Sequence, residues 1–334
     1  MKWIELNYLM YIAMSLLKKN FLISILLLES IGISASDRTT LIAKGDSCVG
    51  QYDYFHALEY YQQARQLYND SRIQMKIADC YYFRYDFQKC TNLLKEVGED
   101  SLSHDSYREI YYAYGAVKQL PSQVYWGNQL LHRYPMDSKI LASLMHVYSS
   151  DVISQPQVAV VLGQKYCKKD SEDIEVNRAL AEAYFVNQNY QQSLDEYQKL
   201  LQQKDTTFSG LYYMGVCYEY LHQLDSARVY LEDAVAKKED SPVASYRLGI
   251  VDTQLHLNGE ALLNLAIAVK LYQPDPTLMH LIYKYMGQAE VELNNYAKGI
   301  EDWQKAQEYL MDDDLQKRMD EVKKKLPEAD SPKG

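Results

Sequence analysis

Small side chains recur at a nearly fixed spacing along the chain, and each is followed by the same apolar pattern. Ala181, Gly215 and Gly249 are 34 residues apart, and Gly45 and Ala78 are 33 apart. Twelve residues after each of them lies a second residue, which is usually small. A large residue follows four positions later, and another apolar residue three positions after that. The sets are Gly45, Ala57, Tyr61, Ala64; Ala78, Cys90, Leu94, Val97; Ala181, Ser193, Tyr197, Leu200; Gly215, Ala227, Leu231, Ala234; Gly249, Ala261, Leu265, Ala268; and Gly287, Gly299, Trp303, Ala306. Steps of four and three keep residues on one helix face, so the pattern predicts amphipathic helices.

The spacing predicts two helices in each repeat, because small residues 12 apart fall on different helices with turn residues between them. Small side chains let two helix backbones approach closely, and we expect the large residue on the second helix to fill the space beside them. Turn-forming residues stand between the two helices, and prolines stand between repeats. The turns are Gly50-Gln51-Tyr52-Asp53, Asn187-Gln188-Asn189, Leu257-Asn258-Gly259 and Asn294-Asn295, and the breaks are Ser241-Pro242 and Pro274-Asp275-Pro276.

The interval from Ala78 to Ala181 is close to three periods, so two further, degenerate units are expected within about 105–170. We expect one hairpin from Tyr107–Ala116 with Gln123–Tyr134, and another from Leu141–Ser149 with Pro156–Lys168. About eight hairpins then occupy 37–313, which exceeds the roughly three that a stable repeat array needs. Residues 314–334 are expected to form a polar capping helix, Leu315–Leu326, and a loose tail.

The pattern resembles the tetratricopeptide repeat family, in which Leu-Gly, a tyrosine and a later alanine recur every 34 residues. Leu248-Gly249 fits the first helix of that repeat, and Asn189-Tyr190 followed by Ser193 fits its turn and second helix. Lys44, Asp252 and Glu290 depart from the family pattern. The resemblance implies an all-α, right-handed superhelical solenoid, whose concave wall is lined by first helices and holds a peptide or protein partner.

The resemblance also implies which positions face a partner, namely those three before, one after and four after each small residue. The candidate partner-binding residues are Met75, Asp79, Tyr82, Arg178, Glu182, Phe185, Tyr212, Val216, Glu219, Tyr246, Ile250, Lys284 and Gln288. Mixed tyrosine, arginine and carboxylate chemistry is typical of recognition surfaces. The alternative is that the tyrosines only pack between adjacent repeats. A clamp for a chaperone's tail is rejected, because its asparagine positions hold other residues, such as Asp79 and Val216.

Charge and composition exclude several classes of function. The formal charge of −10 disfavours nucleic acid, since no basic stripe reverses it. No phosphate loop, zinc-protease motif or nucleophile elbow occurs, so we expect no enzyme, cofactor or metal site. Lone histidines, such as His280 near Tyr283 or His132 near Asp137, are read as surface or packed residues. The five scattered cysteines are read as small apolar residues, and a Cys80–Cys90 bridge stays open for an oxidising compartment.

The amino-terminal segment, 1–36, has the layout of a secretory signal. Lys18-Lys19 precedes an apolar run, Phe21–Leu28, and small residues follow. We expect cleavage near Ser34–Ser36, with translation starting at Met14 as an alternative to Met1, and no stable membrane span after cleavage. An uncleaved anchor or a buried helix is the alternative interpretation.

The sequence therefore predicts an exported scaffold or adaptor in the periplasm or cell envelope that binds a protein or peptide. A membrane-anchored sensory or regulatory ectodomain is the first alternative, and a carbohydrate-binding or enzymatic helical scaffold is the second.

Overall fold

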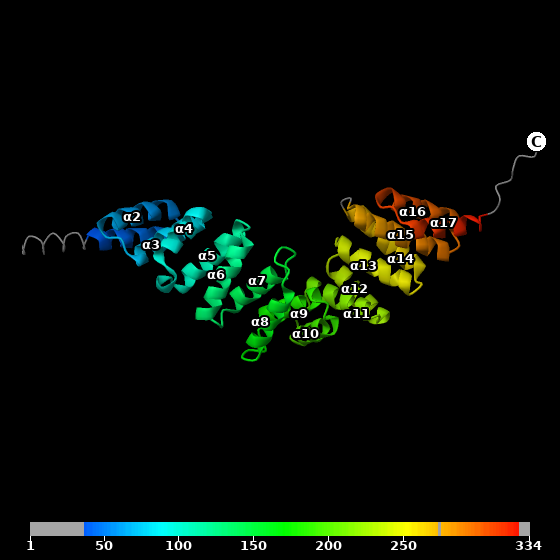
Figure 1. Cartoon of the computed structure of the whole chain (residues 1–334), viewed down its shortest axis with the longest axis horizontal. Helices are drawn as coiled ribbons and strands as arrows, with labels where there is room; N and C mark the ends of the chain where they lie inside the picture. Colours follow the sequence, from blue (N-terminus) through cyan, green and yellow to red (C-terminus); the bar gives the residue numbers. More distant parts are fainter. Residues whose placement is uncertain (1–36, 273–274, 327–334) are drawn as a thin grey trace, which may run out of the picture. The chain divides into compact units, whose positions relative to one another are not determined.

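The computed structural model describes residues 37–272 and 275–326, and over these residues all regular structure is helical (Figure 1). The predicted signal segment and its cleavage positions lie outside the described residues. A helix over residues 37–50 precedes the labelled ones. Those are α2 (Tyr54–Leu67), α3 (Ser71–Phe83), α4 (Phe87–Val97), α5 (His104–Ala116), α6 (Leu120–Arg133), α7 (Ser138–Ser149), α8 (Pro156–Cys167), α9 (Ile174–Val186), α10 (Tyr190–Gln202), α11 (Phe208–Tyr220), α12 (Leu224–Lys237), α13 (Pro242–Gln254), α14 (Asn258–Leu271), α15 (Pro276–Glu292), α16 (Tyr296–Tyr309) and α17 (Asp313–Lys323), with a short 3-10 turn at Glu99–Ser101.

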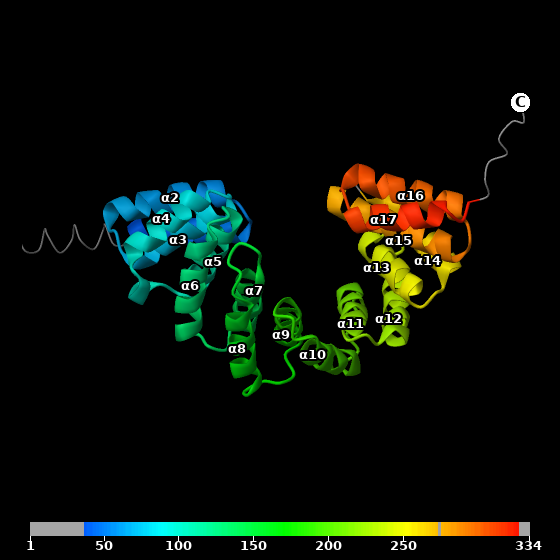
Figure 2. The same cartoon turned by 45° about the vertical axis from the view of Figure 1, so that its right-hand side comes forward.

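These helices form eight hairpins and a final helix, which confirms the predicted solenoid class. The first hairpin joins 37–50 to α2, and the following ones pair consecutive helices from α3 with α4 to α15 with α16. Figure 2 shows α11 and α12 lying side by side as one such pair. Prolines begin several helices, as predicted, because the first turn leaves its N–H groups unbonded in any case. Pro242 and Pro276 occupy this place in α13 and α15.

Each hairpin turns through one residue with a positive φ, and Lys204, between α10 and α11, is a further such residue outside the hairpin turns. Their φ angles lie between 51° and 66°. Those in the hairpin turns are Tyr52, Tyr85, Lys118, Ser154, Gln188, His222, His256 and Asn294, one for each of the eight hairpins. None is a glycine, although left-handed backbone is costly for other residues.

The predicted contact between small and large residues is present in the hairpins. A Cβ atom placed on Gly215 would lie 2.6 Å from Leu231 Cγ, and one placed on Gly249 would lie 2.6 Å from Leu265 Cγ. Gly45 faces Tyr61 and Gly287 faces Trp303 in the same way. The first helix therefore has no room for a side chain where the second helix inserts its large residue.

The second of the two degenerate hairpins, α7 with α8, exchanges these roles between its helices. Met145 on α7 is the large residue, and a Cβ atom on Gly163 of α8 would lie 2.7 Å from Met145 Cε. One period earlier, buried Tyr111 and buried Gly127 hold the equivalent positions on α5 and α6. This reversal of large and small residues explains why the repeat pattern is weak in the sequence of α7 and α8.

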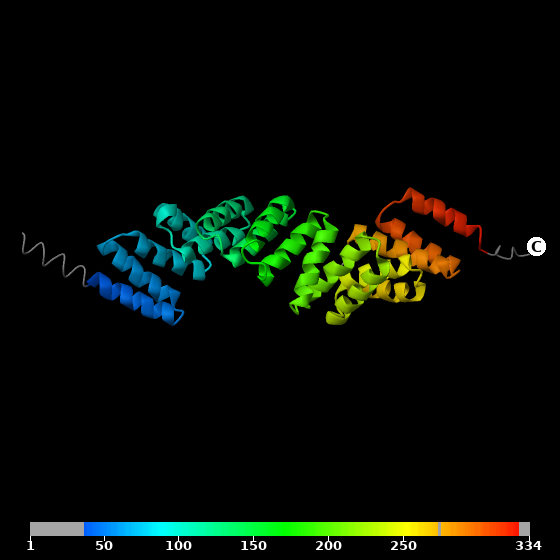
Figure 3. The same cartoon turned by 90° about the horizontal axis from the view of Figure 1, so that it is seen from below.

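The chain divides into two compact units, the first ending at Ile140 and the second beginning at Leu141. In the second unit the last helix, α17, closes the apolar core of the final hairpin (Figure 3). Leu315, Met319 and Val322 pack with Ile300 and Trp303. The predicted cap was Leu315–Leu326, so the helix begins two residues earlier and ends three residues earlier.

Two departures from the family pattern are buried carboxylates with partners inside the chain. Asp252 is fully buried, and it accepts hydrogen bonds from Arg228 Nε and Asn264 Nδ2, both at 2.8 Å. Glu290 is also buried, and it accepts from Asn295 Nδ2 at 2.7 Å and from Lys298. A buried charge needs such partners, so these residues replace the usual tyrosine at the cost of added polar contacts.

Candidate partner-binding surface

Three residues of the predicted binding stripe are buried, which corrects the prediction for them. The exposed fractions are 1% for Val216, 7% for Tyr246 and 4% for Ile250. First helices of successive hairpins pack against each other, including α11 with α13 and α13 with α15. Positions of the stripe that lie between two first helices are therefore part of the core and cannot touch a partner.

Two further stripe residues, Arg178 and Lys284, form ion pairs between repeats. Arg178 Nη2 donates to Asp205 Oδ2 at 2.6 Å, and Lys284 Nζ donates to Asp312 Oδ2 at 2.6 Å. Each cation lies three residues before the small residue, and each aspartate lies just before the next first helix or the final helix. We call this contact the cation–aspartate clamp. These two side chains are held within the solenoid.

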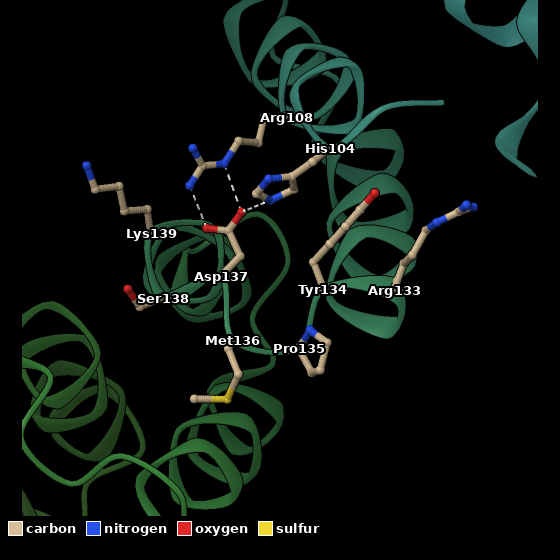
Figure 4. A pocket seen from close by; sticks show the side chains of 9 residues that line it. All are labelled: His104, Arg108, Arg133, Tyr134, Pro135, Met136, Asp137, Ser138 and Lys139. Carbon is tan, nitrogen blue, oxygen red and sulfur yellow. Dashed lines mark hydrogen bonds and ion pairs between the residues drawn. The ribbon is translucent and has the colours of Figure 1, made fainter. Parts of the chain in front are cut away.

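A third clamp lies in the first unit, beside a cavity of about 460 Å³ (Figure 4). Arg108 donates to both carboxylate oxygens of Asp137, from Nε and Nη2, at 2.8 Å each. His104 Nε2 lies 2.7 Å from the same carboxylate, and the Ile140 N–H donates to it at 3.2 Å. Burial alone would raise the pKa of Asp137, but these hydrogen bonds hold it below its ordinary value. The histidine that contacts Asp137 is His104, whereas His132 is exposed, in line with its interpretation from the sequence as a surface or packed residue.

Six other stripe residues are partly exposed. Glu182 pairs with His146 Nδ1 at 3.1 Å, Gln288 donates to Glu292 at 3.1 Å, and Met75 accepts a hydrogen bond from the Ser103 N–H at 3.3 Å. Asp79 and Tyr82 lie on α3, and Phe185 belongs to an aromatic group described below.

Arg247 on α13 contacts three predicted residues, Tyr212, Glu219 and Tyr246. Its Nη1 atom donates to Glu219 at 3.2 and 3.4 Å. The guanidinium carbon lies 5.7 Å from the ring centroids of both Tyr220 and Tyr246, within the range of a cation–π contact. Burial raises the pKa of Glu219, and the Arg247 charge opposes that change. We call these five residues the Arg247 cluster; within it, buried Tyr246 supports the guanidinium from the core side and is not itself a contact for a partner.

An aromatic row continues the Arg247 cluster along α9 to α11. Tyr190 stacks on Tyr220 at 4.5 Å between centroids, and Phe185 contacts Tyr213 at 4.9 Å. Tyr220 is 43% exposed, so its ring is open to a ligand. The sequence interpretation missed Arg247 and Tyr220 because both lie one residue beside the stripe positions, although the repeat spacing already placed them on first helices.

A second aromatic surface lies at the turns of the first two hairpins. Tyr52 and Tyr85, the positive-φ residues there, are 81% and 80% exposed. Phe55 and Phe83 are also exposed, and Phe83 stacks on Tyr54 at 4.7 Å. Turn chemistry predicted the first of these loops, with Tyr52 in it, but gave no signal for the second loop at Tyr85 or for the exposure of either ring.

Within the described ranges, three other observations bear on the candidate chemistry. No three His, Cys, Asp or Glu side chains are grouped so that they could hold a metal ion. No helix there has the length and apolar character needed to cross a membrane. All five cysteines are free in the structure, including Cys80 and Cys90.

The fold is that of tetratricopeptide-repeat proteins. One similar crystal structure is YrrB, described as a tetratricopeptide-repeat protein with an unusual peptide-binding site; it is 20% identical over 60% of this chain and 98% of its own, with a TM-score of 0.50. A second is a tetratricopeptide-repeat protein from Parabacteroides merdae, 13% identical over 75% of this chain and 99% of its own, with a TM-score of 0.51. No protein-family model matches the sequence. No curated protein matches it either.

Proposed function

We propose that this chain is a binding scaffold that holds a peptide or an extended segment of another protein on the first helices of its second unit. The Arg247 cluster carries the proposal. Arginine and tyrosine are the side chains that dominate binding energy at protein interfaces, because they combine a large contact area with hydrogen-bonding groups. Here an arginine already oriented by Glu219 is flanked by Tyr220, whose ring is open to solvent.

The arrangement suits an extended peptide better than a small molecule. Arg247 offers N–H donors for a backbone carbonyl or carboxylate, and Tyr190 with Tyr220 offers a stacked pair of rings for an apolar or aromatic side chain. Since Glu219 and the ring contacts fix the guanidinium before binding, little side-chain entropy is lost when a ligand arrives. The similarity to YrrB, with its peptide-binding site, supports the same reading.

The proposed location is the cell envelope or periplasm. This part rests on the sequence of the amino-terminal segment, with its lysine pair, short apolar run and small residues.

The test is crosslinking in intact cells of the source organism with the full chain tagged at its carboxyl end, followed by mass spectrometry. We compare wild type with Arg247→Lys and Tyr220→Ala, and use Lys317→Met as the control because Lys317 is exposed on α17. The expected result is one discrete partner that both cluster variants lose and the control retains. Circular dichroism checks that each variant folds.

Two outcomes would overturn parts of the proposal. A partner captured equally by all variants would move the binding site away from the Arg247 cluster. If the captured chain still begins at Met1 or Met14, the signal segment is not cleaved, and the anchored ectodomain is favoured.

A further inference from the structure

The outer face of α14 carries large apolar side chains that remain exposed in the fold. Leu263 is 69% exposed, and Ile267 and Leu271 are exposed too. They follow one another at steps of four residues, so they form one continuous ridge along the helix. The opposite side of α14 holds Leu265 and Ala268, which belong to the core formed with α13 and α15. The ridge is therefore not part of the packing between repeats.

The same face is polar on two other second helices of the second unit. The repeat positions of Leu263 and Ile267 hold an acid and a lysine there, namely Asp195 and Lys199 in α10, and Glu301 and Lys305 in α16. Single exposed apolar residues are common on protein surfaces, but a continuous apolar ridge marks a place where another surface binds. The repeat architecture does not require such a ridge on α14.

Glu260 and Lys270 border the ridge near its two ends. Both side chains are exposed, and within the part of the chain that the structure describes neither forms an ion pair. The charge of Arg228 reaches Glu260, but that guanidinium is bonded to Asp252 at 2.8 Å and paired within its own helix. The ridge thus begins beside a carboxylate and ends beside an ammonium group, each open to an outside partner.

We propose that the outer face of α14 packs against the same face of a second copy of this chain, antiparallel and around a twofold axis. In a twofold contact, each residue meets one that is equally far from the axis on the other helix. With the axis level with Leu265, Leu263 meets Ile267 of the second copy, because they lie two residues before and after that level. Glu260 and Lys270 lie five residues before and after it, so this register also forms two ion pairs.

The small residues of the face fit the same register. Leu271 meets Gly259 of the second copy, since both lie six residues from the level of the axis. Nothing lies within 4 Å of the Cβ position of Gly259, so the leucine has room there. Ala266, next to the axis, lets the two backbones approach closely. One register therefore pairs apolar with apolar, acid with base and large with small.

A second copy explains these pairs better than a lipid surface does. A membrane needs no symmetry, and a face with one acid and one lysine, on a chain of charge −10, gains little from anionic lipids. The ridge from Gly259 to Leu271 is about 18 Å long. One helix pair of this length buries less than the roughly 1,200 Å² of a standard stable interface, so the dimer should be weak and reversible. The inference goes beyond the proposed function, and a dimer would carry two Arg247 clusters.

Sedimentation velocity of the full chain, at about 1, 10 and 100 µM, tests for the dimer. The dimer fraction should rise with concentration. Leu263→Glu should weaken the association by about tenfold or more, because it places two charges in the apolar contact. Val161→Glu is the matched control and should leave the association unchanged. Val161 is 62% exposed on α8 and holds the same repeat position as Leu263, three periods earlier.

An exchange of charges tests the antiparallel register. Glu260→Lys and Lys270→Glu should each weaken the dimer by about threefold, since each places like charges opposite one another twice. The double variant exchanges the two charges and should recover the association of wild type. Neither a parallel helix pair nor a contact elsewhere on the chain predicts this recovery. Circular dichroism checks that every variant folds.

Several results would overturn the inference. They are a monomer at every concentration, an association that Leu263→Glu leaves intact, and a double charge variant that associates no better than the single ones. A monomer that binds phosphatidylcholine vesicles, and loses that binding in Leu263→Glu, would assign the ridge to a membrane surface instead. None of these results bears on an Arg247-dependent partner, so the proposed function would stand.

Discussion

Lys284 donates a 2.6 Å hydrogen bond to Asp312, and Asp312 in turn accepts the N–H groups of Asp314 and Leu315 at the start of α17. One carboxylate thus joins a first helix to the cap of the solenoid. These hydrogen bonds, with Lys284 contributing most, lower the pKa of Asp312 to about 2.

The clamp should hold α17 in place above acidic pH. A carboxyl group whose pKa is lowered by folding stabilises the protein above its unfolded pKa, and this contribution is lost as the pH falls toward 2. Asp312→Ala removes both cap and clamp, and should cost about 1 kcal/mol at pH 7. Urea unfolding followed by circular dichroism measures the change, because α17 closes the core that contains Trp303 and Leu315. Equal unfolding midpoints for wild type and Asp312→Ala at pH 7 would show that the clamp does not stabilise α17.

Gly215 should not tolerate a larger side chain. Its Cβ position lies 2.6 Å from Leu231 Cγ and 3.2 Å from the Ala227 carbonyl oxygen. Gly215→Leu should therefore cost about 1 to 3 kcal/mol, and Leu231→Ala in the same chain should recover part of the loss. Gly259→Ala is the control, since nothing lies within 4 Å of its Cβ position. Thermal melting measures all three, and a Gly215→Leu variant that melts with wild type would refute the helix register.

Asp79 on α3 and Glu109 on α5 form a hydrogen-bonded carboxyl pair, which should make the protein less stable as the pH rises. Glu109 has a raised pKa of about 10 in the fold, so its contribution is fully present below its unfolded pKa and is lost progressively between that value and 10. Glu109→Gln should raise the urea midpoint at pH 8 and leave it unchanged at pH 4. Parallel pH profiles of variant and wild type would show that Glu109 is ionised in the fold.

Breaking the ion pair of Arg228 with Asp252 should be more damaging than replacing both residues. Asp252 is fully buried, whereas the Arg228 side chain is 30% exposed. Arg228→Met leaves a buried carboxylate short of one partner and should cost about 3 kcal/mol. Asp252→Leu combined with Arg228→Met should cost clearly less, because no charge is then left inside. Chemical denaturation of both variants distinguishes the two cases.

The repeat spacing was enough to predict the hairpins, because packing forces a small residue and a large residue to face each other at fixed intervals. Gly45 with Tyr61 and Gly287 with Trp303 show this pairing at the two ends of the array. The two degenerate hairpins were predicted only from the length of the interval between Ala78 and Ala181. Packing conserves the combined volume of two facing residues, and Met145 with Gly163 satisfies that volume with the order reversed.

The binding surface was harder to predict because repeat position alone does not decide exposure. Val216 and Glu219 both follow Gly215 on one first helix, yet Val216 is in the core and Glu219 holds Arg247. The clamps were missed for a different reason. Arg178 and Asp205 are 27 residues apart, and no local pattern links two polar residues across such a distance.

The side chains of the left-handed turn residues take no part in the packing between helices. Each hairpin reverses through backbone hydrogen bonds, such as Tyr85 N–H to the Tyr82 carbonyl at 2.9 Å, which do not involve the side chain. The side chain at that position points away from the core, as 80% exposure of Tyr85 shows. The eight positions hold tyrosine, lysine, serine, glutamine, histidine or asparagine, so the tip of each hairpin can gain new contacts without a change in any helix interface.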